Sequence, residues 1–127
     1  MNKYTYPISS STWDDKENQA IINTLKSGNL TMGKKVLTFE KKFSNYLKTK
    51  YCIMVNSGSS ANLLMVASLF YLKNKHKLNK GDEVIVPAVS WSTSYYPFYQ
   101  YGLKLKFVDI DIDSLNYNLN SLKKAIS

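Results

Sequence analysis

A run of small, hydroxyl-bearing residues, Ser57-Gly58-Ser59-Ser60, separates an apolar segment from a helix-forming one. The first turn of a helix has amide N–H groups without intrahelical acceptors, and it lies at the positive end of the helix dipole. Small side chains let the oxygens of an anion reach those amides, and Gly58 would supply a tight backbone conformation. The pattern is neither of the glycine-rich nucleotide motifs. It indicates either a phosphate-binding turn or a plain serine cap.

A second candidate segment is aromatic and rich in hydroxyl groups. Residues 90–97 are Ser-Trp-Ser-Thr-Ser-Tyr-Tyr-Pro. The indole of Trp91 could stack on a flat aromatic cofactor, and the neighbouring hydroxyls could position a polar substrate. The alternative is an aromatic packing cluster beneath a loop.

The elements that must position these segments follow from hydrophobic periodicity and from turn residues. Buried strands are expected over residues 51–56, 83–88 and 104–110. Helices are expected over residues 12–27 (with Thr12 as cap), 36–48, 61–73, part of 90–101, and 119–126. Strands that alternate with helices predict an α/β fold with a mostly parallel sheet. The carboxyl ends of parallel strands meet at one edge, so the two candidate segments should lie together there.

Composition narrows the class of protein. The net charge is +8, yet all seventeen basic residues are lysines. Because arginine makes most bidentate contacts to bases and phosphates, its absence disfavours nucleic acid as a partner. No apolar run is long enough to span a bilayer, and no secretory signal opens the chain, so we expect a cytoplasmic protein without a membrane partner. Cys52 is the only cysteine and is expected to be a small core residue.

The remaining titratable residues suggest no further site. His76 lies among lysines without a neighbour at metal-ligand spacing. Asp109, Asp111 and Asp113 alternate after the last strand, but no calcium-loop pattern follows, which favours a solvated turn. The sequence therefore indicates no metal site, and no catalytic residue is assigned within this chain.

Several motifs in order resemble the N-terminal third of the DegT/DnrJ/EryC1/StrS enzymes, which act on nucleotide sugars. The matching segments are Tyr6-Pro7, residues 10–15, Thr31-Met32-Gly33, and residues 56–65, 81–93 and 101–111. The resemblance implies the N-terminal part of the large domain of a pyridoxal-phosphate-dependent transferase of the aspartate aminotransferase type (fold type I). In that fold a mixed, mostly parallel sheet lies between helix layers, and the active sites lie at the interface of a homodimer.

The resemblance also implies roles for individual residues. Gly58, Ser59 and Ser60 would hold the phosphate of pyridoxal 5'-phosphate (PLP) or pyridoxamine 5'-phosphate (PMP), and Trp91 would stack against the pyridine ring. Thr31, Met32 and Gly33 would lie near the mouth of the active site, against the sugar nucleotide.

Within this family the likeness is strongest to the 3-dehydratases, which remove the C3 hydroxyl of a nucleotide-linked 4-keto-6-deoxyhexose during deoxysugar and O-antigen synthesis. Glutamate is the expected amino donor. The sugar-nucleotide aminotransferases are the alternative. In the 3-dehydratases a histidine replaces the Schiff-base lysine of the aminotransferases, and this position would follow residue 127, so residues 1–127 do not distinguish the two classes. We expect residues 1–127 to be a fragment of a longer chain, inactive by itself, and a remnant without turnover is a third interpretation.

Overall fold

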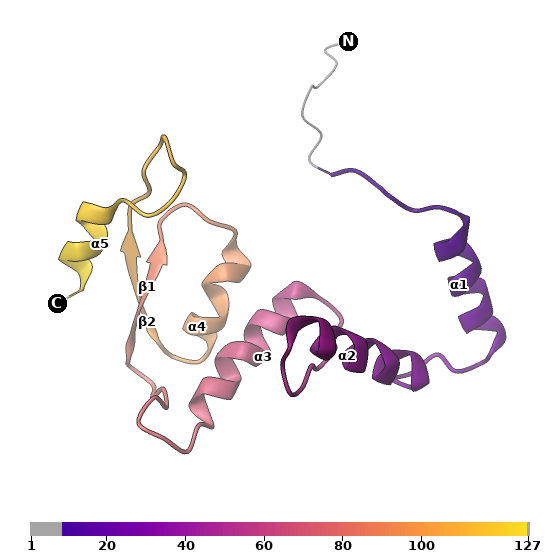
Figure 1. Ribbon diagram of the computed structural model, residues 1–127. Coiled ribbons are helices and arrows are strands. Elements are labelled where there is room, and N and C mark those ends of the chain that lie inside the picture. The colour runs from indigo at the N-terminus through magenta and orange to yellow at the C-terminus, as the bar shows by residue number, and fades with distance from the viewer. Residues whose placement is uncertain (1–8, 127) are drawn as a thin grey trace, which may run out of the picture. The chain divides into compact units, whose positions relative to one another are not determined.

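The computed structural model describes residues 9–126 (Figure 1). Its internal contacts divide the chain into two compact units, Met1–Ile53 and Met54–Ser127, and each is described by itself. The Tyr6-Pro7 motif lies outside the described residues. No helix within residues 9–126 is long and apolar enough to cross a membrane.

The first unit contains helices α1 (Asp15–Lys26) and α2 (Lys34–Leu47), both expected from their amphipathic patterns. The predicted cap at Thr12 is wrong by two residues, because Asp14 caps α1. The Asp14 carboxylate accepts from the Lys16 amide at 2.7 Å, and the Glu17 carboxylate accepts from the Asp14 amide at 2.8 Å. This reciprocal pair satisfies two amides that a helix would otherwise leave open.

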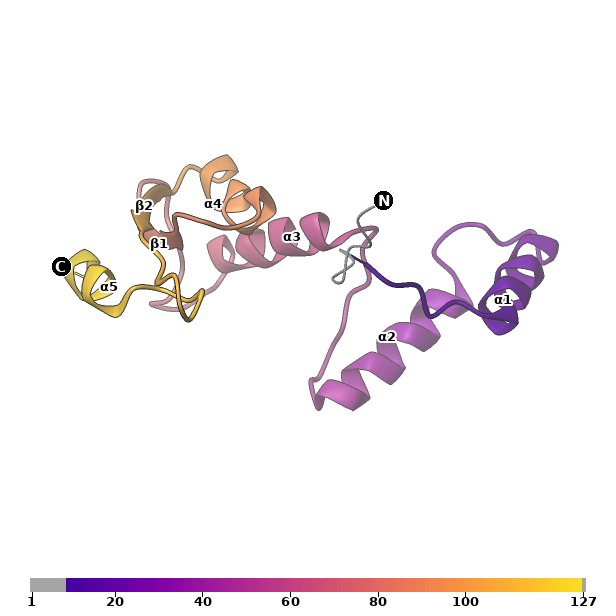
Figure 2. The ribbon, with the colours of Figure 1, turned by 90° about the horizontal axis from the view of Figure 1, so that it is seen from above.

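The second unit is built on two parallel strands, β1 (Glu83–Pro87) and β2 (Lys104–Val108), paired from Glu83↔Lys104 to Pro87↔Val108. The crossover between them runs through a 3-10 turn, η1 (Ser92–Ser94), and a short helix, α4 (Tyr96–Gln100). Helix α3 (Gly58–Phe70) packs on this crossover, as Figures 1 and 2 show. The small core consists of Val66, Ala67, Val86, Leu103 and Val108.

The predicted strand over residues 51–56 is wrong. No residue of this segment belongs to a strand in the described part of the chain, and Ile53 is 68% exposed. An apolar run predicts burial, whereas a strand also needs a neighbour for its backbone N–H and C=O groups. Cys52, expected in the core, is half-buried in this segment. Two of the three predicted strands are therefore confirmed.

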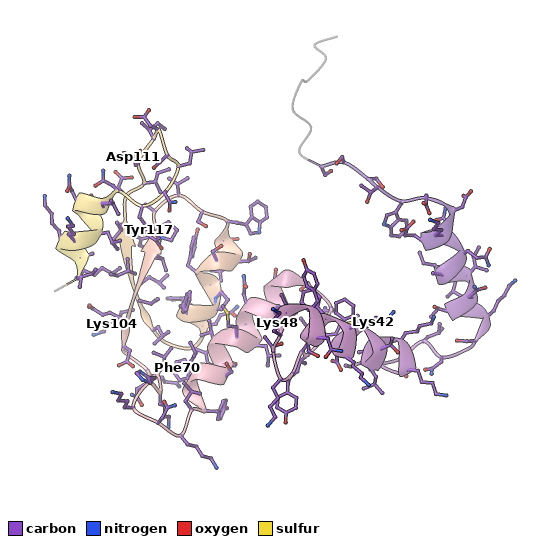
Figure 3. All side chains as sticks on the ribbon, in the orientation of Figure 1. Lys42, Lys48, Phe70, Lys104, Asp111 and Tyr117 are labelled. Carbon is purple, nitrogen blue, oxygen red and sulfur yellow. The ribbon has the colours of Figure 1, made fainter. Side chains whose placement is uncertain are left out.

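The chain after β2 turns back through an acidic loop and enters helix α5 (Leu119–Ala125). Ile110 and Tyr117 form an antiparallel bridge at its base, and Figure 3 labels Asp111 and Tyr117 there. The Asp111 carboxylate accepts from the Ser114 amide at 2.9 Å, the Ser114 hydroxyl at 3.0 Å and the Asp113 amide at 3.2 Å. Asp111 is therefore the residue that shapes this turn.

The loop should respond to acid through Asp111. Hydrogen bonds from Ser114 lower the pKa of this carboxyl below its ordinary value of 3.8. A lowered pKa means that the folded loop favours the carboxylate, so its stabilisation is complete above the ordinary value and is lost as the pH falls through the lowered one. We expect the hydrogen-exchange protection factor of the Ser114 amide to fall below pH 3.8. Asp111→Asn keeps an acceptor and should remove this dependence, and a protection factor independent of pH in the unsubstituted chain would contradict the account.

Candidate cofactor site

The start of helix α3 offers two open amides. Ser57 is the cap: its hydroxyl oxygen accepts from the Ser60 amide at 3.1 Å, and its carbonyl accepts from the Ala61 amide at 3.0 Å. The amides of Gly58 and Ser59 donate to no group within residues 9–126. Ser60 therefore has only its hydroxyl to offer an anion, while Gly58 and Ser59 offer backbone N–H groups at the positive end of the helix.

Gly58 does not have the tight conformation that the sequence suggested. Positive φ angles occur at Gly28, Gly81 and Gly102 among the described glycines, but Gly58 lies in ordinary helical conformation. A Cβ atom added at Gly58 would meet nothing within 4 Å. The backbone therefore does not require glycine here, and the missing side chain leaves open space beside the amide, which an anion could use.

The carboxyl end of β1 presents Trp91 to solvent. The Trp91 carbonyl accepts from the Ser94 amide at 2.9 Å, which forms the 3-10 turn, and the residue is 76% exposed. The packing-cluster interpretation is therefore wrong for Trp91. It holds for Tyr95, whose ring contacts Phe107 edge-on with centroids 5.8 Å apart.

The two candidate segments come together, as expected, but through the start of α3 and the crossover after β1 rather than through two neighbouring strand ends. Ser59 and Ser60 from α3 and Thr93 from η1 line one cavity of about 200 Å³. Its other lining residues are Leu63, Tyr96, Pro97 and Gln100. The cavity wall contains hydroxyl groups and an amide but no lysine, so an anion there would be held by neutral donors and the helix dipole. Gly58 and Trp91 do not line this cavity.

The residues expected near a sugar nucleotide lie in the first unit. Thr31 and Gly33 line a second cavity of about 620 Å³, between the end of α1 and the start of α2. Met32 is 73% exposed and does not line it. A Cβ at Gly33 would lie 2.8 Å from the side-chain nitrogen of Asn29, an exposed side chain that could move aside.

Three residues to which the sequence analysis assigned no individual role also belong to the second unit's site. Tyr96 and Gln100 lie four positions apart on α4, and both face the cavity. Asn62 donates from its side-chain nitrogen to the Thr93 carbonyl at 3.1 Å. The i, i+4 spacing of Tyr96 and Gln100 could have signalled a shared face. Nothing local could have signalled a contact between positions 62 and 93.

Comparison with known proteins decides the family. Residues 11–127 match the DegT/DnrJ/EryC1/StrS aminotransferase family. The chain belongs to this family. Among curated relatives, the GDP-4-keto-6-deoxy-D-mannose 3-dehydratase of Escherichia coli O55:H7 is 57% identical over 122 residues, which are 96% of this chain and 31% of that protein. The enzyme of the same name from Yersinia pseudotuberculosis is 56% identical over an equal share.

Solved structures of family members share the fold of this chain. The E. coli GDP-4-keto-6-deoxy-D-mannose-3-dehydratase with bound hydrated PLP superposes with a TM-score of 0.86 and 57% identity, over 97% of this chain and 31% of that one. A putative sugar aminotransferase of Streptococcus pneumoniae in its PMP form gives 0.79 and 30% identity, over 98% of this chain and 30% of that one. The chain therefore spans about a third of the length of these relatives, and the expected PLP fold type I is confirmed.

Proposed function

We propose that residues 1–127 are the N-terminal portion of one PLP-binding large domain, in an enzyme that removes the C3 hydroxyl of a nucleotide-linked 4-keto-6-deoxyhexose. The step would serve deoxysugar synthesis for O-antigen or lipopolysaccharide. The 57% identity to a 3-dehydratase over 96% of the chain carries this proposal. The joint cavity of α3 and η1 supports it, because it collects donors suited to a phosphate.

The phosphate of the cofactor would lie at the start of α3. The open amides of Gly58 and Ser59 and the hydroxyls of Ser59 and Ser60 would donate to its oxygens. The helix dipole would stabilise its negative charge without a paired lysine. The space in front of Gly58 suits this approach, because no side chain fills it.

The pyridine ring of the cofactor would lie against Trp91. An exposed indole at the carboxyl end of β1 offers a flat apolar face, and stacking on that face would orient the ring and exclude water from one side. When bound, PLP or PMP supplies the electron-withdrawing ring that lets the C3 hydroxyl leave.

The remaining partners are assigned on the family likeness. Thr31, Met32 and Gly33 would contact the sugar nucleotide, with the first two presenting side chains and Gly33 giving close approach. Glutamate would be the amino donor, and the enzyme would be a homodimer. A solved 3-dehydratase with bound GDP-perosamine, 57% identical over 97% of this chain, supports a sugar nucleotide as ligand.

A sugar-nucleotide aminotransferase is the second candidate. The S. pneumoniae aminotransferase shares this part of the fold with a TM-score of 0.79. Both classes would use the same phosphate turn and ring contact, so the residues described here do not separate them. The residue at the family's lysine position does separate them.

The gene itself tests this choice first. If the codons after position 127 continue in frame, a histidine at the family's lysine position supports the 3-dehydratase, and a lysine there supports the aminotransferase. We also expect purified residues 1–127 alone to show no turnover of a 4-keto-6-deoxy sugar nucleotide with PMP, because no proton-transferring residue is assigned within them. Turnover by that isolated chain, measured beside the complete gene product, would contradict the division of roles.

A further inference from the structure

One side chain joins the first turns of α3 to the turn that carries Trp91. The half-buried Asn62 amide group donates to the Thr93 carbonyl at 3.1 Å, across 31 positions of sequence. The other side-chain hydrogen bonds of described residues from Ser57 to Ile126 span at most three positions. Asn62 is therefore the long-range polar link between the two halves of the candidate site.

The Thr93 carbonyl accepts from no backbone amide of the described residues. In a 3-10 turn a carbonyl accepts from the N–H three residues later, but the Tyr96 amide makes no such bond to Thr93, and Pro97, the next residue, has no N–H. The neighbouring amides are directed elsewhere: Tyr95 donates to Ser92, and Phe98 donates to Tyr95. Asn62 supplies the missing donor, and its loss would leave a half-buried carbonyl unpaired.

The hydrogen bond between Asn62 and Thr93 connects the two ends of the proposed cofactor site, the start of α3 and the turn that carries Trp91. Asn62 lies one helical turn after Gly58 and Ser59, and Thr93 lies two residues after Trp91. Two cavities adjoin the linked residues, one of about 200 Å³ lined by Thr93 and one of about 180 Å³ lined by Asn62 and Ser94. Because this open space leaves the packing around the turn incomplete, the hydrogen bond adds to what holds the turn in place.

We propose that Asn62 is a positioning residue for the cofactor, which holds the phosphate-binding amides and the Trp91 indole at a fixed separation. It acts through Thr93, and no contact of Asn62 itself with phosphate or ring is required. This inference rests on the proposed function.

The test compares variants of the complete gene product by titration with PLP. Asn62→Leu removes the donor at similar volume, and Asn62→Gln keeps an amide donor. Ser68→Ala is the matched control, because the Ser68 hydroxyl donates to Met65 in the same helix at 2.7 Å. We expect Asn62→Leu to raise the PLP dissociation constant about tenfold, Asn62→Gln to stay within about threefold, and Ser68→Ala to have no effect.

A second readout separates positioning from stability. Saturating PLP should quench the fluorescence of Trp91 less in Asn62→Leu than in the unsubstituted protein. The Trp91 signal is obtained by subtracting the fluorescence of the same protein carrying Trp91→Phe. Urea unfolding of each variant without cofactor measures stability separately, and Asn62→Gln should keep both the urea midpoint and the quenching.

Two results would overturn the inference. One is an unchanged PLP dissociation constant in Asn62→Leu, and the other is full quenching of Trp91 in that variant. Failure of the unsubstituted protein to bind PLP would instead overturn the proposed function.

Discussion

Replacing Ser59 with aspartate is expected to weaken PLP binding about a thousandfold while leaving the fold intact. The carboxylate would project where the phosphate is proposed to lie, and two like charges about 4 Å apart repel by ~4 kcal/mol at an effective dielectric constant of about 20. Without cofactor the same carboxylate lies at the positive end of α3, which stabilises a helix by about 0.3–1 kcal/mol. Binding and stability should therefore change in opposite directions.

The measurement pairs a PLP titration with urea unfolding of the protein without cofactor. Ser59→Asn is the matched control, because it has nearly the same shape as aspartate and no charge. If Ser59→Asp binds PLP as tightly as Ser59→Asn, the phosphate does not lie at this turn.

Removing the indole of Trp91 is the change with the second largest expected effect. Stacking of a flat ring on an aromatic side chain contributes about 1–3 kcal/mol in nucleic-acid complexes, so Trp91→Ala should raise the PLP dissociation constant about tenfold. Trp91→Phe should recover part of this loss. Because Trp91 is 76% exposed, the substitution should change the urea midpoint little.

Tyr99→Ala provides the control for loss of an exposed aromatic ring. Tyr99 lies on α4, is 69% exposed and does not line the cavity near α3. The Tyr99→Ala variant should bind PLP with the same affinity as the unsubstituted protein. Equal affinities for Trp91→Ala and Tyr99→Ala would show that the cofactor ring does not contact Trp91.

Much of the local structure was predictable because its cause is local. The amphipathic periods identify α1 and α2, and the short apolar runs identify β1 and β2. The first helix is capped by Asp14 rather than by Thr12, because Glu17 lies at the spacing that completes a reciprocal cap with Asp14. That spacing was visible in the sequence, so this boundary could have been placed correctly.

Other features depend on partners that are distant in sequence. Residues 51–56 have the apolar pattern of a strand, but a strand also requires a ladder, and no residue of this segment is in one within residues 9–126. Gly58 suggested a strained turn, whereas the structure gives it helical geometry and open space. The hydrogen bond from Asn62 to Thr93 could not be predicted from the sequence, because its donor and acceptor lie on separate elements 31 positions apart.

The most direct test of the central claim incubates the protein made from the complete gene with PMP, glutamate and GDP-4-keto-6-deoxy-D-mannose. Mass spectrometry then identifies the sugar nucleotide that is formed. The account predicts a sugar that has lost its C3 oxygen and keeps its keto group, formed only when cofactor is present and lost in Ser59→Asp. A sugar whose keto oxygen is replaced by an amine would establish the aminotransferase instead. Conversion without cofactor, or full activity in Ser59→Asp, would contradict the site proposed at the start of α3.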